Sequence, residues 1–385
     1  MPLAAARARV AEVRAAGGEP LVRALVEQAE LEPILSHRQA VVRGLLGEPA
    51  ALLDTLQLPA LEGRVLLRLA HVKLSEQDLE GAEQLVARAI SRVDNAEIVV
   101  EANALLARSS IRRKQFTQAE QALAQLSGHD STDPDQLAAR RAAAQVAIAI
   151  VELALEQTHW DDARERLDVL ESAVENDEDL LEQRYVTQQM RAAVALSTQS
   201  WDIACNALRA TLTLAKAVDA AEEEVETRIA LAGALVERGD SISLDEAEKH
   251  LQNSRDRALE SHLDALYTAA LIGQAGVLNK KGKTKAALDR CIEIAEQAAK
   301  NADLNGYQLA VALMSQIYEQ KGDLASAYRT YAEAHATLRD IIGDRAKDLF
   351  LPHIRALAER IGPDKFREIA SQVNQAAHAR KTFLS

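Results

Sequence analysis

The chain has 385 residues, a net charge of −13, and 48% hydrophobic but only 3% aromatic residues. This acidic balance excludes nucleic acid as the expected main partner, because binding phosphates needs a basic face. The two cysteines, Cys205 and Cys291, are distant in sequence and make neither a disulfide framework nor a CxxC metal pair.

The composition predicts an all-α protein. With so few aromatic residues the core must consist of Ala, Leu, Val and Ile, while Gly and Pro, which interrupt helices, are scarce. No proline occurs between Pro134 and Pro352, which indicates long uninterrupted helices. The longest apolar stretch, residues 142–155, contains Gln145 and Glu152 and is too short to span a bilayer, so we expect no membrane insertion.

Residues 1–60 form the first predicted part, an N-terminal helical segment. Pro20, Pro33, Pro49 and Pro59 divide it into about three short helices. Arginines interrupt its first run of alanines, so the apolar core of a signal peptide is missing and the expected compartment is the cytoplasm.

Residues 61–343 contain a repeated pattern: a large apolar residue, an alanine three positions later, and another apolar residue four positions after that. A constant pitch of this size is the sequence signature of a repeat architecture. Seven copies occur at a pitch near 40 residues, and their anchoring alanines are Ala82, Ala119, Ala163, Ala204, Ala247, Ala287 and Ala327.

A second column of mostly small residues stands twelve positions before the anchoring alanines. Small residues on two consecutive helices let the facing backbones approach closely. Between the columns, the last three copies carry a turn glycine, where the first four carry Gln77, Lys114, Thr158 and Gln199. The column consists of Ala70, Ala107, Val151, Ala192, Ala232, Ala275 and Ser315, and an insertion of three residues in the fifth copy moves Ala232 out of the common spacing.

The stretch "YEQKGDLASAYRTYAEA" (residues 318–334) resembles the tetratricopeptide repeat (TPR), a helix-turn-helix unit. Tyr318 matches the aromatic residue late in the first helix, Gly322 the turn, and Ala327, Tyr331 and Ala334 the pattern of the second helix. The resemblance implies a right-handed α-solenoid of seven TPR-like repeats. Because the pitch exceeds the about 34 residues of the usual repeat, we expect longer helices.

The chain's two tryptophans, Trp160 and Trp201, occupy the same position in two successive copies. This is the position of Phe116 and Leu79 in the first two copies, at the start of the second helix. We therefore expect both rings to pack between helices. The alternative is a pair of rings that forms a platform for a ligand.

Residues 344–385 are predicted to form C-terminal capping helices, with Gly362 ending one helix and Pro363 opening the next. A repeat array needs such caps to cover the apolar face of its last repeat. Phe350, Leu357 and Phe366 are the expected covering residues.

The sequence contains no pattern that predicts catalysis, a metal or a cofactor. HExxH and GxSxG motifs are absent, and the nine histidines lack ligand spacing. The stretch "GVLNKKGKT" (residues 276–284) has five residues between its glycines instead of the four of a phosphate-binding loop, and no strand precedes it. Its lysines are interpreted as a solvated turn, with a partner contact as the alternative.

The TPR resemblance implies that partners bind the concave face, which the first helices of the repeats form. On this face we expect a cationic pocket for a carboxylate or an acidic peptide, because arginine donates paired hydrogen bonds to carboxylates. The alternative is that these side chains pair with neighbouring acids such as Glu101. The predicted residues, which follow helical spacing on two helices, are Arg64, Arg68, His71, Arg108 and Arg112.

The sequence thus favours a non-catalytic scaffold or adaptor that binds a peptide or protein partner. The alternative is a TPR-type sensory regulator gated by a small peptide or ligand, because some bacterial pheromone sensors combine a small helical bundle with about seven TPR-like repeats. Abundant alanine, and arginine in preference to lysine, suggest a bacterial source. The sequence carries no signal for an oligomeric state.

Overall fold

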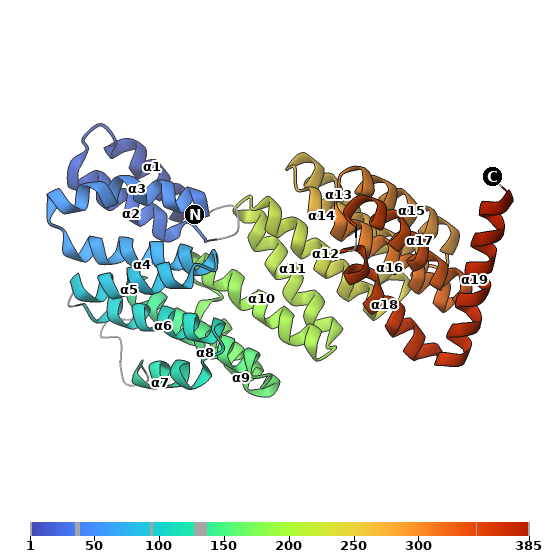
Figure 1. The fold of residues 1–385 in the computed structure, drawn as a ribbon. Coiled ribbons are helices and arrows are strands. Elements are labelled where there is room, and N and C mark those ends of the chain that lie inside the picture. The colour runs from blue at the N-terminus through green and yellow to red at the C-terminus, as the bar shows by residue number, and fades with distance from the viewer. Residues whose placement is uncertain (1, 35–38, 93–94, 127–136, 344, 384–385) are drawn as a thin grey trace. The chain divides into compact units, whose positions relative to one another are not determined.

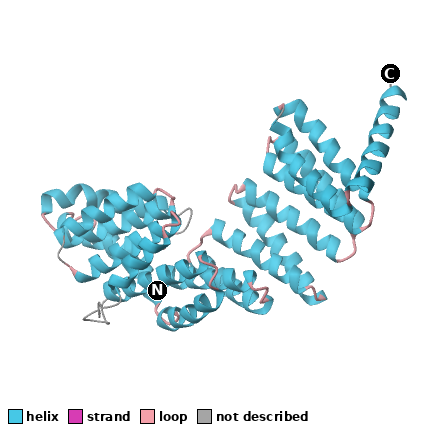
Figure 2. Ribbon diagram, turned by 60° about the horizontal axis from the view of Figure 1, so that its bottom comes forward, coloured by secondary structure: helices cyan, strands magenta, loops and turns pink. Residues whose placement is uncertain are grey.

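The computed structural model describes residues 2–34, 39–92, 95–126, 137–343 and 345–383. Throughout these residues the regular structure consists of α-helices and one 3₁₀ helix, without a strand (Figure 2). The all-α prediction is confirmed. Within the same ranges, no helix is both long enough and apolar enough to cross a bilayer.

Nineteen α-helices follow one another along the described residues (Figure 1). Three precede the repeats, namely α1 (Pro2–Val13), α2 (Gly18–Leu31) and α3 (Gln39–Leu56). Seven helical hairpins follow, as the sequence predicts. They are α4 (Pro59–Ser75) with α5 (Leu79–Arg92), α6 (Ala96–Arg112) with α7 (Phe116–Leu126), α8 (Leu137–Glu156) with α9 (Trp160–Val174), α10 (Leu181–Ser197) with α11 (Trp201–Ala217), α12 (Ala221–Arg238) with α13 (Ser241–Glu260), α14 (Asp264–Lys280) with α15 (Thr284–Lys300), and α16 (Leu304–Gln320) with α17 (Leu324–Ile342).

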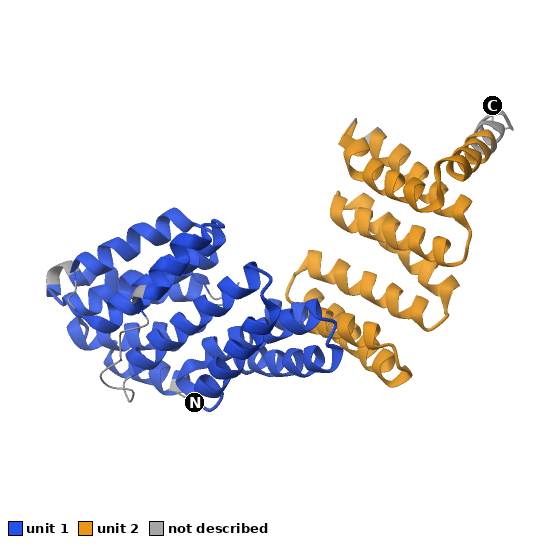
Figure 3. Cartoon of the chain, turned by 90° about the horizontal axis from the view of Figure 1, so that it is seen from below, with its two compact units in different colours: residues 1–227 blue, residues 228–385 orange. Residues whose placement is uncertain are grey.

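The chain divides into two compact units, residues 1–227 (unit 1) and residues 228–385 (unit 2), shown in different colours in Figure 3. The division lies within α12, inside the predicted repeat array. The division into segments 1–60, 61–343 and 344–385 stays a prediction.

The two columns of small residues lie where the repeat pattern predicts, in the contacts between helices. Among the anchoring alanines, Ala82 is 3% exposed and the other six are 0% exposed. Every member of the second column is buried as well, Ser315 included. The small side chains of these columns let the helices approach closely, so both columns set the spacing within each hairpin.

The turn within each hairpin uses the same left-handed backbone conformation whether or not glycine is present. Gly239, Gly282 and Gly322 have φ of 81°, 74° and 76°, and the four corresponding non-glycine residues have φ between 55° and 63°. In the third hairpin the Thr158 amide donates to the Leu155 carbonyl (3.0 Å). The corresponding turn residues of the other hairpins also donate to a carbonyl near the end of the first helix, which gives that carbonyl a hydrogen-bond donor. The hairpins therefore impose this conformation even on Thr158, whose β-branched side chain disfavours it.

The insertion in the fifth repeat lengthens its second helix. Helix α13 begins at Ser241, three residues before Leu244, which is the first residue of the repeated pattern. The Asp240 side chain accepts a hydrogen bond from the Ser243 amide (2.9 Å) and caps this extension.

Both tryptophans open a second helix, Trp160 in α9 and Trp201 in α11, so they occupy one repeated structural position. Both are half-buried. Part of each tryptophan thus stays exposed, and packing between helices stays the prediction, with the ligand platform as its alternative.

Two helices follow the last repeat, α18 (Arg345–Ile361) and α19 (Pro363–Phe383), and Gly362 between them has φ of 86°. Phe350 and Leu357 of α18 are completely buried in one apolar cluster with α16 and α17. The Phe366 ring packs edge-on against Tyr328, with 5.3 Å between ring centroids. Phe350, Leu357 and Phe366 therefore lie against helices of the last repeat.

We predict that Thr158→Gly stabilises unit 1 by about 1 kcal/mol, because removing a β-branched side chain from a left-handed conformation outweighs the added freedom of the unfolded chain. Tryptophan fluorescence during chemical unfolding measures unit 1 alone, since Trp160 and Trp201 are the only tryptophans. Thr158→Ala, which keeps the β-carbon, should gain less. A glycine variant no more stable than the alanine variant contradicts the interpretation.

Candidate functional site

The five residues predicted to bind a partner lie on the first helices of the first two hairpins. Arg64, Arg68 and His71 belong to α4, and Arg108 and Arg112 belong to α6. Helices α4, α6, α8 and α10 contact one another in succession, and we call the surface that they form the first-helix face of unit 1. Arg68, His71 and Arg108 are buried, whereas Arg64 and Arg112 are half-buried.

Arg108 links three successive repeats. Its Nε and Nη2 donate to the two carboxylate oxygens of Glu152 on α8 at 2.8 and 2.7 Å. Its Nη1 lies 3.0 Å from both Gln145 Oε1 and His71 Nε2. Arginine only donates, and the Arg108 contact at Nε2 is shorter than the 3.5 Å contact between Arg68 Nη1 and His71 Nδ1. We therefore assign the neutral form of His71 with Nε2 as the acceptor and the proton on Nδ1. That nitrogen lies 3.5 Å from Glu182 Oε1.

Arg68 connects the first repeat to the fourth and to the end of α2. Its Nη2 donates to Glu182 Oε2 on α10 at 2.8 Å, and 3% of the Arg68 side chain is exposed. The same guanidinium donates to two main-chain carbonyls, those of Ala29 (3.0 Å) and Glu32. Arg68 thus pairs with a carboxylate 114 residues away in sequence and also holds a segment that precedes the repeats.

Arg64 and Arg112 lie at the edge of this arrangement. Arg64 donates through Nε (2.6 Å) and Nη2 to the two carboxylate oxygens of Glu30, at the end of α2. Arg112 donates to the carbonyl of Leu74, near the C-terminal end of α4. Glu30 also lies 3.5 Å from Arg141 Nη1 of α8.

These interactions form one largely buried group of charges that joins α2 to four successive first helices. A charge taken out of water is costly unless an opposite charge and hydrogen bonds compensate it, and here each charge has both. We call this group the ionic cluster. Its members are Glu30, Arg64, Arg68, His71, Arg108, Arg141, Glu152 and Glu182.

The cluster shifts the protonation of its own members. Burial alone would raise the pKa of Glu182, but Arg68, His71 and the hydrogen bonds lower it to about 2. Burial lowers the pKa of His71 to about 3, and Arg108, Arg68 and Arg112 act in the same direction against Glu182. The lowered pKa of His71 agrees with a neutral imidazole between a carboxylate and a guanidinium. Burial also raises the pKa of the nearby Glu101, to which Glu30 and Glu182 contribute.

The segment Ala29–Ile34 is held through its backbone as well as through its two glutamate side chains, and we call it the exit segment because the chain leaves α2 here. Helix α2 ends at Leu31, and Glu32 is extended (φ −73°, ψ 118°) because Pro33 follows. The Glu30 carbonyl accepts a hydrogen bond from Arg141 (3.3 Å). At the other end, the Ile34 amide donates to Glu182 Oε2 (3.1 Å).

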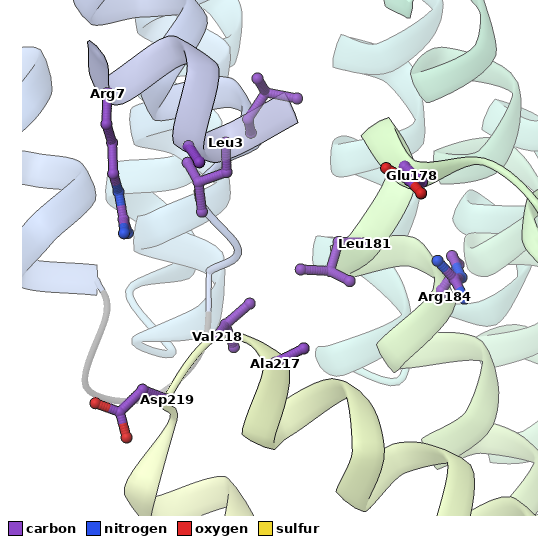
Figure 4. Close-up of a pocket in the computed structure, with 10 residues that line it drawn as sticks. Leu3, Arg7, Glu178, Leu181, Arg184, Ala217, Val218 and Asp219 are labelled. Atoms are coloured by element: carbon purple, nitrogen blue, oxygen red, sulfur yellow. The ribbon is translucent and has the colours of Figure 1, made fainter. Parts of the chain in front are cut away.

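A pocket of about 360 Å³ borders the exit segment (Figure 4). Leu3 and Arg7 of α1 line one side, and Leu181 and Arg184 of α10 lie across from them. Arg7 reaches from this pocket to the exit segment, where its Nη2 donates to both carboxylate oxygens of Glu32 at 3.0 and 2.9 Å. Space therefore remains between α1 and α10 beside a tightly bound segment.

The sequence placed the arginines on one face but did not identify their main partners. Arg108 pairs with Glu152, 44 residues away, although Glu101 is much nearer in sequence. A signal for Glu152 exists, since His71, Arg108 and Glu152 each stand eleven residues before the anchoring alanine of their repeat. Glu30 and Glu32 lie outside the repeats, so the register carried no signal for them.

Elsewhere among the described residues, no group of three or more His, Cys, Asp or Glu side chains could hold a metal ion. In the lysine-rich turn of the sixth repeat, Lys281 forms ion pairs with Asp245 (2.6 Å) and Glu248 (2.5 Å) of unit 2. These pairs agree with a solvated structural turn.

We predict that His71 makes unit 1 less stable in acid. The unfolded chain binds a proton at His71 below about pH 6.5, whereas the folded protein binds this proton only below about pH 3, because the pKa of His71 is lowered to about 3. Stability is therefore lost as the pH falls, by about 2 kcal/mol between about pH 7.5 and about pH 5.

His71→Gln keeps a donor and an acceptor but does not titrate, so its unfolding free energy should depend less on pH over this range. The comparison isolates His71, because Glu101, whose raised pKa acts in the opposite direction, is present in both proteins. Tryptophan-monitored unfolding at the two pH values is the measurement. Equal losses in the two proteins would rule out a buried neutral His71.

Known structures resemble this fold at low sequence identity. The chain is similar to the apo form of RapI, with a TM-score of 0.63 and 13% identity over 84% of this chain and 88% of that chain. It is also similar to a signal transduction ATPase with numerous domains (STAND) from Pyrococcus horikoshii that has a tetratricopeptide repeat sensor. That match has a TM-score of 0.57 and 14% identity, and covers 89% of this chain and 54% of the other.

No protein-family model and no curated protein matches the sequence. The likeness to solved structures therefore concerns the fold. Seven helical hairpins, two buried columns of small residues and the likeness to these structures lead to one conclusion: the chain is a TPR-like helical-repeat protein.

Proposed function

We propose that the chain is a non-catalytic scaffold or adaptor of the cytoplasm that binds an extended acidic segment of a peptide or protein partner. The binding surface is the first-helix face of unit 1. The residues that contact the partner there are Arg64, Arg68, His71, Arg108 and Arg112.

The observation that carries this proposal is the set of bonds from Arg68 and Arg141 to main-chain carbonyls of the exit segment. Two of these carbonyls, those of Ala29 and Glu30, belong to the last turn of α2, where no intrahelical donor is left for them, and the third belongs to the extended Glu32. A peptide segment of any sequence offers main-chain carbonyls wherever its own structure leaves them unpaired. Side chains from two different repeats that point their guanidinium groups at a peptide backbone form a recognition surface for chain segments.

Preference for acidic partners follows from the arginine chemistry. Arg64 and Arg108 each donate two hydrogen bonds to one carboxylate within the protein. Paired bonds of this kind recognise the planar shape of a carboxylate as well as its charge. Attraction of an acidic peptide to these residues weakens as salt screens the charges.

A second candidate function is that of a sensory regulator, in which peptide binding changes the state of another part of a protein. The similarity to a STAND protein whose repeats are described as a sensor favours this candidate. The two candidates share the same binding surface and differ in what binding controls.

We expect the purified protein to enrich acidic sequences from a library of random heptapeptides, and to do so less at high salt. Replacing Arg64 and Arg112 with Gln should weaken binding of an enriched peptide by about 10-fold or more, since each lost charged hydrogen bond contributes about 1.5–3 kcal/mol. Fluorescence anisotropy measures the affinity. Both residues are half-buried, so the variant should keep its fold.

The matched control is Arg164→Gln with Arg166→Gln, which removes the same charge from α9, a second helix of the same unit. The control variant should bind like the original protein. Equal loss in both variants would mean that only overall charge matters, and a library result without acidic preference would contradict the proposal.

A further inference from the structure

The exit segment, which consists of the last turn of α2 (residues 29–31) and the three residues that follow it, occupies the first-helix face as a bound peptide could. It belongs to no repeat, and it crosses side chains of α4, α8 and α10. The first-helix face and α1 contact both the backbone and the acidic side chains of this segment. This is the surface to which the proposed function assigns the partner.

Backbone recognition covers four of the six positions of the exit segment. Arg68 donates to the carbonyls of Ala29 and Glu32, and Arg141 donates to that of Glu30. Glu182 accepts from the amide of Ile34. Since Pro33 has no amide hydrogen, its position needs no acceptor.

Side-chain recognition adds two carboxylate contacts, two residues apart. Glu30 pairs with Arg64 of α4 and is 9% exposed, and Glu32 pairs with Arg7 of α1 and is 0% exposed. Pairing lowers the pKa of Glu30 although burial opposes it, because Arg141 and Arg64 favour the charged form. A segment that replaces the exit segment must carry two carboxylates at the same spacing, because Arg64 and Arg7 would otherwise lose their opposite charges.

We propose that the exit segment is a built-in competitor, and that the partner of the first-helix face is a segment with the same chemistry. This chemistry is two glutamates separated by one residue, followed by proline and an aliphatic residue. The inference rests on the proposed function and adds to it the recognised sequence and a means of regulation.

The tether makes this competitor effective. A segment attached to its own site acts at an effective concentration in the millimolar range, so a free peptide of similar intrinsic affinity binds weakly. The apparent affinity for a free peptide equals the intrinsic affinity multiplied by the fraction of molecules whose first-helix face is vacant. The pocket between α1 and α10 reaches Arg7 and Leu31, and it provides the space through which an incoming segment approaches the occupied surface.

The test uses a fluorescent synthetic peptide, QAELEPI, which copies residues 28–34, and a control peptide, QAQLQPI, which lacks both charges. Binding is measured by anisotropy with the full chain and with its double variant Glu30→Gln, Glu32→Gln. The variant's own segment no longer satisfies Arg64 and Arg7. We expect QAELEPI to bind the variant at least about 10-fold more tightly than the original protein, and QAQLQPI to show no such gain.

A second measurement needs no substitution in the cluster. When millimolar QAELEPI displaces the exit segment of the original protein, the Ile34 amide loses its bond to Glu182, and its hydrogen exchange should become about 10-fold faster or more. QAQLQPI should leave the exchange unchanged. Unchanged exchange with QAELEPI overturns the inference, even where the double variant does not fold.

Failure of this inference is distinguishable from failure of the proposed function. If QAELEPI binds the original protein as tightly as the double variant, the face is not self-occupied and the competitor is refuted, while the proposed function stands. If QAELEPI binds neither protein, the inference is refuted as well. The acidic preference in the heptapeptide library then decides the proposed function separately.

Discussion

A buried guanidinium without a counter-charge would destabilise unit 1, and the pairing of Arg68 with Glu182 prevents this. The pair joins the first repeat to the fourth, so it stabilises an arrangement that spans several hairpins. In a repeat protein most contacts connect neighbours only. An ion pair across 114 residues therefore couples parts of unit 1 that the alanine columns alone leave independent.

The same pair couples the repeats to the helices that precede them. Glu182 accepts from the backbone of Ile34, and Arg68 donates to the backbone of the α2 end. Any change that frees the exit segment leaves Arg68 and Glu182 with fewer partners, and any change in their pairing loosens the segment. A partner bound at the proposed surface would therefore compete with the contacts that hold the N-terminal helices, and such coupling is what a regulator requires.

Most of the fold could be predicted from the sequence, because the repeat pattern depends on residues that are close together in the chain. The anchoring alanines, the helix starts at Trp160 and Trp201, and the break at Gly362 all depend on residues within one hairpin or one turn. The partners of the arginines depend on the stacking of several repeats and on a segment outside them. Glu182 and Glu30 carry no local mark of that role, whereas Glu152 could have been found by following the register of His71 and Arg108 into the third repeat.

A double-mutant cycle on Arg68 and Glu182 tests most directly whether this buried pair holds unit 1 together. Arg68→Met and Glu182→Gln are made singly and together, and tryptophan fluorescence follows chemical unfolding of unit 1. Each single change should cost about 3–5 kcal/mol, because it leaves the other charge buried without its partner. The double variant should cost less than the sum of the two by about 2 kcal/mol or more. Additive costs would contradict a direct interaction between the two side chains and, with it, the account of the ionic cluster.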